Sequence, residues 1–450
     1  MGFVITDSKK SDGSPESTFV NGDLGVDMSR TATIILSGGQ GTRLFPLTLH
    51  CSKPAVRIGG KFKLIDIPIS NAINSGCGKI FVLTQFFSSS LHSHIFRVHS
   101  QRMQNHSGCV ELLTAEQKHK KQEWFQGTAD AVRQNLDYLY QVPADYFLIL
   151  SGDQLYSMDY KDMMRKAIES NADVVIAALP IEEKECHRMG LLKIDAERKV
   201  VDFVEKPNHV DLLKQMKLSA TDKSKMPILS QSRNYLASMG IYLFKRDVLF
   251  DLLQKDPRED FGKHLLPSIV EKGNVYASIF DGYWEDIGTI DAFYRANMDL
   301  IKPNTPFNFY NEKRPVYGAH FQLPPAQIIG ANIASSFICD GCVVEGDEIQ
   351  RSILGPRTIV GKGTKIFDSY VMGSDFYKPP IHTHTLPLEI KIGRDCLIKK
   401  AIIDKNVCIG NNVRLTNANN VQHYDGECLY VRDGIIVIPR GVTIPDGFTF

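Results

Sequence analysis

The chain has 450 residues, of which 43% are hydrophobic and 23% charged, and its formal net charge is +1. This length exceeds one ordinary hydrophobic core, so we expect two domains. The near-neutral charge gives no reason to expect a nucleic acid or an acidic membrane surface as partner, and no apolar run approaches membrane-spanning length. Nine scattered cysteines, an odd number, fit a reducing compartment and hence a cytoplasmic location.

The N-terminal segment does not have the pattern of a targeting sequence. Its first thirty residues lack the apolar core of a signal peptide, and their acidic residues argue against a transit peptide. Residues 7–27 are rich in Ser, Asp and Gly. We therefore expect a disordered tail over residues 1–29.

A glycine-rich loop follows the first predicted strand. The apolar run 32–36 is typical of a buried strand, and the loop after it holds three glycines within residues 38–41. Glycine lets backbone N–H groups approach a ligand closely, so such a loop can cradle phosphate oxygens. Arg43 and Lys53 add two cations beside it. The alternative is an ordinary turn whose cations face water. The clustering of all these residues in one short stretch favours a polyphosphate site.

The loop matches neither of the two common phosphate-binding fingerprints. A Walker loop has Lys and Ser or Thr directly after its last glycine, where this chain has Thr42 and Arg43. The dinucleotide fingerprint has three glycines that open a helix, and here Pro46 soon interrupts.

The next elements alternate between strands and helices. We expect strands over residues 79–86, 110–115, 146–150 and 173–179, and helices over residues 71–75, 88–103, 128–140 and 159–170. This alternation predicts an α/β, Rossmann-like domain with a mostly parallel sheet and helices on both faces. Ligands in such sheets lie beyond the carboxyl ends of the strands, and both the glycine loop and Asp153 follow strands in this way.

From residue 191 the pattern changes. We expect a hairpin of residues 191–195 and 199–205, a polar surface excursion at 208–231, strands at 237–244 and 275–281, and a helix at 289–301. The first domain would thus span residues 30–302. Residues 303–318 contain three prolines and are predicted to be a linker.

Beyond the linker the sequence is repetitive. Aliphatic residues recur about every six positions, as at Ile353, Ile359 and Ile366, with glycines such as Gly361 between them. This short period predicts a left-handed parallel β-helix over residues 319–450, in preference to a β-sandwich with turns at similar spacing. Residues 379–387 interrupt the repeat, and we expect an extruded loop there.

Two acidic residues are candidate metal ligands. Asp153 follows a buried strand, and Asp286 lies in the stretch Tyr283–Thr289. Two carboxylates that meet over a nucleotide would hold Mg²⁺, which prefers oxygen ligands and bridges phosphates. Either residue alone could equally be an N-cap or a turn residue.

Two further stretches could contact a ligand. Glu205 and Lys206 lie at a strand end, where a cation could meet a sugar phosphate, although a solvated strand end is the commoner case. Gly127 and Thr128 open a predicted helix. Helix N-termini favour anions, although Thr128 could simply be the N-cap.

Seven motifs that occur in order carry a resemblance to a known family. They are Gly-Gly-Gln-Gly-Thr-Arg-Leu (38–44), Lys-Pro-Ala-Val (53–56), Trp-Phe-Gln-Gly-Thr-Ala-Asp-Ala-Val (124–132), Ser-Gly-Asp-Gln-Leu-Tyr (151–156), Phe-Val-Glu-Lys-Pro (203–207), Ala-Ser-Met-Gly-Ile-Tyr (237–242) and Asp-Gly-Tyr-Trp-Glu-Asp-Ile-Gly (281–288). Over residues 31–450 the chain resembles the sugar-nucleotide pyrophosphorylases, and within them the glucose-1-phosphate adenylyltransferase (ADP-glucose pyrophosphorylase) branch.

The resemblance implies an activity and its participants. It implies transfer of the adenylyl group of ATP to α-D-glucose 1-phosphate, giving ADP-glucose and pyrophosphate for glycogen or starch synthesis. It further implies Mg²⁺ as cofactor, control by an anionic metabolite effector, and assembly as a homotetramer. Two alternatives stay open: a pyrophosphorylase that uses UTP or dTTP, and a catalytically silent regulatory subunit of the same enzyme.

The resemblance also implies roles for individual residues. Catalysis is implied for Asp153, Arg43 and Lys53, and Mg²⁺ binding for Asp153 and Asp286. Nucleotide binding is implied for Gly38, Gly39, Gln40, Gly41, Thr42, Gln117, Gly127, Thr128 and Asp130. Binding of glucose 1-phosphate is implied for Phe125, Gly190, Glu205, Lys206 and Ser238. Effector binding is implied for Arg57, Lys63, Lys405 and Arg440.

The chain departs from the family pattern near the expected effector site. His50, Cys51 and Ser52 stand where many members have a basic pair before Lys-Pro. The identity of the effector is therefore left open. A separate departure, Phe125 in place of the usual Tyr, removes a hydroxyl near the expected sugar site.

Overall fold

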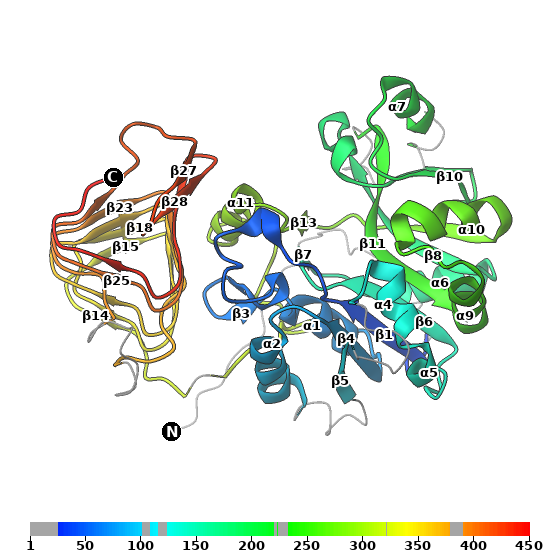
Figure 1. Ribbon diagram of the computed structural model, residues 1–450, viewed down its shortest axis with the longest axis horizontal. Helices are drawn as coiled ribbons and strands as arrows, with labels where there is room; N and C mark the ends of the chain where they lie inside the picture. The colour runs from blue at the N-terminus through cyan, green and yellow to red at the C-terminus, as the bar shows by residue number, and fades with distance from the viewer. Residues whose placement is uncertain are drawn as a thin grey trace, which may run out of the picture.

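The computed structural model describes residues 26–100, 109–115, 124–219, 223, 233–320, 322–378 and 390–450. Outside these residues lie most of the expected tail, Gln117, the parts 220–222 and 224–231 of the polar excursion, and the interruption at 379–387. Figure 1 shows a mixed α/β domain beside a solenoid that contains the C-terminus. None of the helices in the described stretches combines the length and the apolar character needed to span a lipid bilayer.

A nine-stranded sheet forms the centre of the first domain. Its strands are β1 (Thr31–Leu36), β4 (Lys79–Thr84), β5 (Cys109–Thr114), β6 (Tyr146–Ser151), β8 (Val174–Ile181), β9 (Leu191–Ile194), β10 (Val200–Val204), β11 (Tyr235–Lys245) and β12 (Val275–Ile279). The order is β10-β9-β11-β6-β1-β4-β5, and β8 pairs with both β11 and β12. β6, β1, β4 and β5 run parallel, whereas β11 is antiparallel to β6, β8 and β9. The mostly parallel sheet is confirmed.

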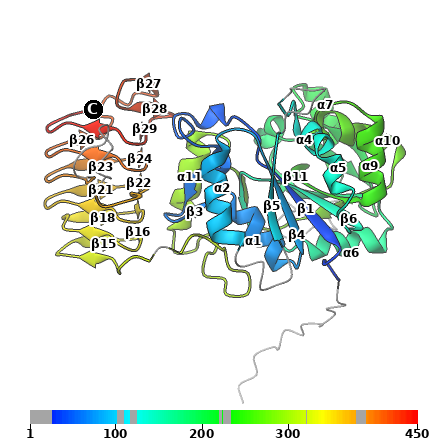
Figure 2. The ribbon, with the colours of Figure 1, turned by 60° about the horizontal axis from the view of Figure 1, so that its bottom comes forward.

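Alternate residues of these strands bury themselves on opposite faces of the sheet. Ile35 belongs to one hydrophobic core with helices α1, α2, α6 and α11, whereas Ile34 belongs to another with α4, α5, α9 and α10. Both faces are therefore covered, which explains why the parallel strands are continuous apolar runs. Figure 2 shows α1 and α2 on one side and α4, α5, α9 and α10 on the other.

The helices are short and amphipathic. They are α1 (Asp66–Asn74), α2 (Ser88–Ile95), α4 (Thr128–Gln134), α5 (Leu136–Leu139), α6 (Lys161–Glu169), α7 (Val210–Met216), α9 (Arg246–Lys255), α10 (Leu266–Lys272) and α11 (Ile290–Leu300). Single turns occur at η1 (Thr42–Leu44), η2 (Lys53–Ala55), η3 (Phe96–Ser100), η4 (Glu183–Arg188) and η6 (Phe261–Leu265). α11 begins at the N-cap Thr289, whose hydroxyl accepts from the N–H of Ala292.

Three helix predictions need correction. The predicted helix 71–75 begins at Asp66, because Pro68 falls in its first turn, where no intrahelical N–H is required. The predicted helix 128–140 breaks at Asn135, whose side-chain amide donates to the Ala131 carbonyl. The predicted helix 88–103 ends at Ile95 and continues as the π-helical turn η3.

The second domain is a parallel β-helix with three sheets. One sheet is β14 (Gln327–Ile328), β17 (Val343–Val344) and β20 (Ile359–Val360); the second is β15 (Asn332–Ala334), β18 (Glu348–Gln350), β21 (Lys365–Phe367), β23 (Leu397–Lys399) and β26 (Arg414–Leu415); the third is β16 (Phe337–Ile338), β19 (Ile353–Leu354), β22 (Tyr370–Val371), β24 (Ala401–Ile403) and β29 (Ile435–Ile438). β25 (Cys408–Ile409) pairs with β30 (Thr443–Ile444). Ile353, Ile359 and Ile366 lie on three successive strands, so the predicted six-residue period corresponds to one side of each coil.

The two domains share one hydrophobic core. Phe293 of α11 packs on Tyr370 of β22, with ring centroids 5.7 Å apart, and the Tyr294 hydroxyl donates to the Asp368 carbonyl at 2.7 Å. The connecting residues 303–318 contain no helix or strand and pack on the first domain, where Phe309 stacks on Phe62. The β-helix is therefore firmly docked through its third sheet.

Candidate functional site

Two short strands bring the candidate metal ligands together. β7 (Gln154–Tyr156) follows β6 directly and pairs antiparallel with β13 (Trp284–Asp286), so that Asp286 lies opposite Gln154. This pairing places Asp286 beside Asp153, although 133 residues separate them along the chain. The sequence-predicted carboxylate pair is thus assembled by the fold.

Lys53 lies between the two carboxylates. Its Nζ is 2.5 Å from Oδ2 of Asp153 and 3.5 Å from Oδ1 of Asp286, and its side chain is nearly buried. Burial by itself would raise the pKa of Asp153. The charge of Lys53 and the hydrogen bonds from Lys53 and Ser151 outweigh burial, so the pKa is lowered and the carboxylate stays ionised.

The donor set suits a hard divalent cation. Oδ2 of Asp153 and Oδ1 of Asp286 both contact the Lys53 ammonium group. The separation of these two oxygens therefore cannot exceed the sum of their distances to Lys53 Nζ. Two carboxylates against one ammonium leave an excess negative charge. Carboxylate oxygens are the ligands that Mg²⁺ prefers, so Asp153 and Asp286 fit this cofactor.

The glycine loop packs against the base of this cluster. Gly38, Gly39 and Gln40 line a cavity of about 810 Å³. A Cβ built on Gly39 meets nothing within 4 Å, whereas one on Gly41 would lie 2.9 Å from Cβ of Lys53. Gly41 also has φ 66°, a conformation that glycine adopts without strain. The loop thus opens to the cavity at one end and contacts Lys53 at the other.

Arg43 and Thr42 lie at the outer side of the loop. Arg43 is exposed, and its Nη2 would lie 3.5 Å from a Cβ built on Gly288, which directly follows Ile287 and Asp286. Thr42 is exposed and lines a separate apolar hollow with Phe45 and Phe87. The Cβ position built on Gly288 is also 3.0 Å from Oδ2 of Asp286, so the Arg43 guanidinium lies close to the carboxylate cluster, whereas Thr42 is outside the residues that line the main cavity.

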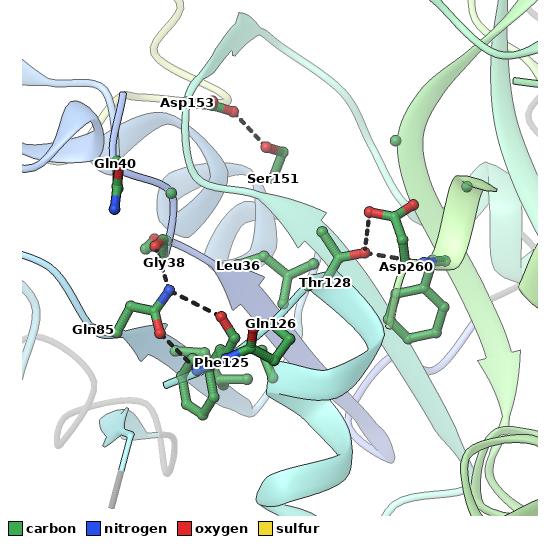
Figure 3. Close-up of a pocket in the computed structure, with 18 of the residues that line it drawn as sticks. Leu36, Gly38, Gln40, Gln85, Phe125, Gln126, Thr128, Ser151, Asp153 and Asp260 are labelled. Carbon is green, nitrogen blue, oxygen red and sulfur yellow. Dashed lines mark hydrogen bonds between the residues drawn. The ribbon is translucent and has the colours of Figure 1, made fainter. Parts of the chain in front are cut away.

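One wall of the cavity depends on Gln85, which sequence reasoning missed. Its amide nitrogen donates to the Gly38 carbonyl at 2.9 Å, and its oxygen accepts from the N–H of Phe125 at 2.8 Å (Figure 3). Gln85 thus ties the glycine loop to the stretch 124–128. It directly follows β4, so the rule that ligands lie beyond strand ends could have found it.

The opposite wall contains Thr128 and Asp260. The Thr128 hydroxyl donates to Oδ2 of Asp260 at 3.1 Å and accepts from the N–H of Phe261 at 3.0 Å (Figure 3). Gly127 is required there, because a Cβ would lie 2.4 Å from the Glu259 carbonyl oxygen. Asp260 also lines the cavity, and no motif in the sequence indicated it, whereas Tyr242, another lining residue, ends the motif 237–242.

The start of α4 is satisfied within the protein. The N–H groups of Ala129 and Asp130 both donate to the Glu259 carbonyl, so neither is a spare donor for an anion. The Asp130 carboxylate accepts from the N–H of Gln126 and from Gln134. It is outside the residues that line the cavity and supports the helix start instead.

The candidate sugar-phosphate residues lie around Glu205, which lines the cavity. A Cβ on Gly190 would lie 2.6 Å from Oε2 of Glu205, so glycine at 190 makes room for this carboxylate. Ser238 donates its N–H to the Gly190 carbonyl at 2.8 Å. Lys206 is exposed, with Nζ 3.3 Å from Oε1 of Glu205. Phe125 also lines the cavity.

The four candidate effector residues gather elsewhere, at the seam between the domains. Arg57, Lys405 and Arg440 each contact the Asp375 carboxylate, at 3.3, 2.8 and 3.0 Å. Arg57 also donates to the Met372 carbonyl at 2.7 Å. Burial would raise the pKa of Asp375, but the three cations lower it strongly. Asp375 was not predicted from the sequence.

Lys63 and Cys51 complete this seam. Burial, and then the charge of Lys405, lowers the pKa of Lys63 to about 8. Burial, and then Asp404, raises the pKa of the Cys51 thiol to about 11, so this residue adds no charge. The seam is therefore rich in positive charge around the Asp375 carboxylate, and the Asp404 carboxylate is buried close to the same cations.

A separate buried group contains Asp66, His94 and His99, side chains that can ligate metals. Both histidine Nε2 atoms contact Oδ1 of Asp66, at 2.6 and 2.8 Å. In an α-helix two residues five apart would point about 140° apart, and the π-helical turn η3 brings them together. Within the part of the chain that the structure describes, His99 Nδ1 has no hydrogen-bond partner, whereas a metal-bound imidazole needs an acceptor for its second N–H. The geometry fits two imidazoles that both donate through Nε2 to one carboxylate.

Comparison with protein families gives two matches along the chain. Residues 32–303 match the family model described as nucleotidyl transferase. Residues 322–449 match the model described as GLGC left-handed parallel β-helix domain, which agrees with the predicted hand of the solenoid. The first match alone covers more than half of the chain.

Proposed function

Because the chain belongs to the nucleotidyl transferase family, we propose that it transfers the adenylyl group of ATP to α-D-glucose 1-phosphate, giving ADP-glucose and pyrophosphate. Its two domains in this order are the architecture of the sugar-nucleotide pyrophosphorylases. The observation that carries the proposal is Lys53 between Asp153 and Asp286, beside a glycine-lined cavity.

The reaction needs positioning and charge neutralisation. A phosphate oxygen of the sugar phosphate attacks the α-phosphorus of ATP, and pyrophosphate leaves on the opposite side. No bond to the protein forms, so the chain has to align two phosphates and offset their charge. Lys53 and Arg43 supply cations at the loop, and the backbone at Gly38 and Gly39 allows close approach of the triphosphate.

Asp153 and Asp286 would hold Mg²⁺. When bound there, Mg²⁺ neutralises phosphate charge and helps the pyrophosphate to leave. Asp153 is ionised well below neutral pH, because Lys53 and its hydrogen bonds lower its pKa against the effect of burial. Lys53 keeps the two carboxylates together.

Glu205 and Lys206 would bind the second substrate. The Glu205 carboxylate, for which Gly190 makes room, lines the cavity and can accept hydrogen bonds from sugar hydroxyls there. Lys206 is exposed beside it and can bind the sugar phosphate as a point charge. The cavity of about 810 Å³ has room for a nucleotide together with a sugar.

We extend the proposal to regulation and assembly. The cations at the seam would bind an anionic metabolite effector, and the enzyme would act as a homotetramer in glycogen or starch synthesis in the cytoplasm. The support for an effector site is the convergence of Arg57, Lys405 and Arg440 on one carboxylate.

Pyrophosphate release tests the activity directly. The protein is incubated with glucose 1-phosphate, Mg²⁺ and each of ATP, UTP, dTTP, CTP and GTP in turn. We expect a strong preference for ATP. Preference for UTP or dTTP would be consistent with the proposed mechanism but would assign the protein to a different pathway. No release from folded protein with any nucleotide would favour the silent regulatory subunit.

A further inference from the structure

The segment that follows the glycine loop contacts the β-helix. The rings of Phe45 and Tyr430 pack edge to face, with centroids 5.1 Å apart and ring planes at 86°. The Arg432 guanidinium lies over both rings, 5.7 Å from the centre of Phe45 and 5.5 Å from that of Tyr430. In Figures 1 and 2 the blue segment after β1 extends toward β28.

Tyr430 and Arg432 belong to a hairpin that the solenoid repeat does not require. β27 (His423–Asp425) and β28 (Tyr430–Arg432) add two antiparallel strands to the edge of the third sheet, with Tyr430 opposite Val437 of β29. Arg432 is held by the Asp425 carboxylate at 2.5 Å and by the Tyr424 carbonyl at 3.1 Å. The aromatic contact is therefore presented on a braced support.

Phe45 is joined to the glycine loop by a short chain of contacts. Its N–H donates to the Thr42 carbonyl at 3.2 Å, which closes the turn η1. Thr48 donates to the Gly41 carbonyl at 3.1 Å, and Gly41 packs directly on the side chain of Lys53. A displacement of Phe45 would therefore move the loop and the lysine that faces the carboxylates.

We propose that the hairpin β27–β28 is a positioning element for the nucleotide. Tyr430 and Arg432 hold Phe45, and Phe45 holds the glycine loop in the conformation that receives a triphosphate. Without the contact the loop has more conformational freedom, and the nucleotide has to offset the cost of ordering it. This inference rests on the proposed function and assigns Tyr430, Arg432 and Phe45 as positioning residues.

Two tyrosines of the same hairpin provide a matched test. Tyr430→Ala removes the ring on Phe45, whereas Tyr424→Ala removes a ring that packs on Phe450. For Tyr430→Ala we expect the Kd of Mg-ATP, measured by calorimetry without the second substrate, to rise about threefold to tenfold, as for loss of one aromatic contact with its cation. The KM for glucose 1-phosphate should stay unchanged. Tyr424→Ala should match the unmodified protein, and Tyr430→Phe should restore the Kd.

Amide hydrogen exchange in the ligand-free protein gives a readout that does not depend on activity. We expect faster exchange over residues 38–48 in Tyr430→Ala than in Tyr424→Ala. Phe45→Ala, which removes the other ring of the contact, should produce the same change in exchange. Combining Phe45→Ala with Tyr430→Ala should increase exchange little beyond either single variant. If Tyr430→Ala does not fold, Phe45→Ala serves as the second variant.

The outcomes separate the two proposals. Equal Kd values and equal exchange in Tyr430→Ala and Tyr424→Ala would overturn the positioning role. A lower melting temperature of Tyr430→Ala with an unchanged Kd would also overturn it, because the contact would then be purely structural. If the unmodified protein binds no nucleotide while Tyr430→Ala still loosens residues 38–48, the coupling stands and the proposed function fails.

Discussion

Asp153 combines burial with a negative charge, an unfavourable state that Lys53 and Ser151 make possible. Its carboxylate contacts the Lys53 ammonium group and the Ser151 hydroxyl, so it is held in place before any substrate arrives. A preorganised charge of this kind costs no reorganisation during the reaction. Asp153 is therefore the side chain whose charge matters most in the candidate site.

Asp153→Asn removes that charge with almost no change in shape. We expect turnover to fall by about a hundredfold or more, because Lys53 loses its partner and the metal site loses an oxygen charge. The control is Asp159→Asn, which lies nearby and pairs with Arg314 at 3.0 Å. Steady-state pyrophosphate release measures both. Near-normal turnover of Asp153→Asn would refute the assigned role.

The Asp66 group makes stability depend on pH. Burial lowers the pKa of His94 below its usual 6.5, although Asp66 opposes this. Burial would raise the pKa of Asp66, but its hydrogen bonds from His94 and His99 lower it, so Asp66 stays charged. At pH values between the folded pKa of His94 and its usual 6.5, the unfolded chain binds more protons than the folded protein. Stability is therefore full above pH 6.5 and falls as the pH decreases through that window.

His94→Gln removes this proton linkage and one buried hydrogen bond. We expect stability at neutral pH to fall by about 1–3 kcal/mol, and the further loss of melting temperature between about pH 7 and pH 5 to be smaller than in the unmodified protein. His423→Gln, at an exposed position of β27, is the control. Thermal melts at several pH values measure the difference. Parallel pH curves for His94→Gln and the unmodified protein would show that His94 does not titrate in this window.

At the scale of elements, the glycine loop contains two glycines with different requirements. Gly39 has open space where a Cβ would be, whereas Gly41 combines φ 66° with a Cβ position 2.9 Å from Lys53. The first glycine serves an approaching ligand, and the second serves the backbone. The sequence alone shows both simply as glycines of one loop.

Alanine substitutions separate these two requirements. Gly39→Ala should leave the melting temperature unchanged while it raises the KM for ATP, because the methyl group occupies the space of a phosphate. Gly41→Ala should lower stability by about 1–3 kcal/mol, since alanine is strained at positive φ. Thermal melts and ATP titrations of the two variants give the comparison. A normal KM for ATP in Gly39→Ala would exclude phosphate contact at this glycine.

Elements that depend on local pattern were predictable. β1, β4 and β6 are continuous apolar runs buried on both faces, and the six-residue period of the solenoid appears directly in the sequence. β7 and β13 were missed because each has only three residues and forms by pairing with the other. No local signal indicates such a pairing.

The residues of the candidate site also fall into two groups, those that sequence motifs predicted and those that only long-range packing brings to the site. Asp153 and Asp286 came from motifs, and the fold brings both to Lys53. Asp260 has no motif of its own and reaches the cavity only because α4 packs on the segment before η6. Asp375 likewise meets Arg57 only when the β-helix docks, whereas Lys405 and Arg440 belong to the same domain as Asp375. Long-range packing of this kind cannot be read from a single sequence.

At the scale of the whole molecule, the seam between the domains is both apolar and charged. Phe293 and Tyr370 belong to one core that spans the two domains, and beside it Asp375 joins Arg57 of the first domain to Lys405 and Arg440 of the second. Asp375 thus acts as an internal anion. A metabolite anion that bound these cations would compete with a carboxylate already in place.

Asp375→Asn removes the internal anion and keeps the shape. We expect stability to fall by about 1–3 kcal/mol, because Arg57, Lys405 and Arg440 then repel one another and the carboxylate is partly buried. Inorganic phosphate at millimolar concentration should raise the melting temperature of this variant more than that of the unmodified protein, since a ligand that binds only the folded state stabilises it. Asp162→Asn, which breaks an exposed pair with Arg165, should show neither effect. Equal phosphate responses in all three proteins would mean that these cations do not accept an anion from solution, and the effector site would then have to lie elsewhere.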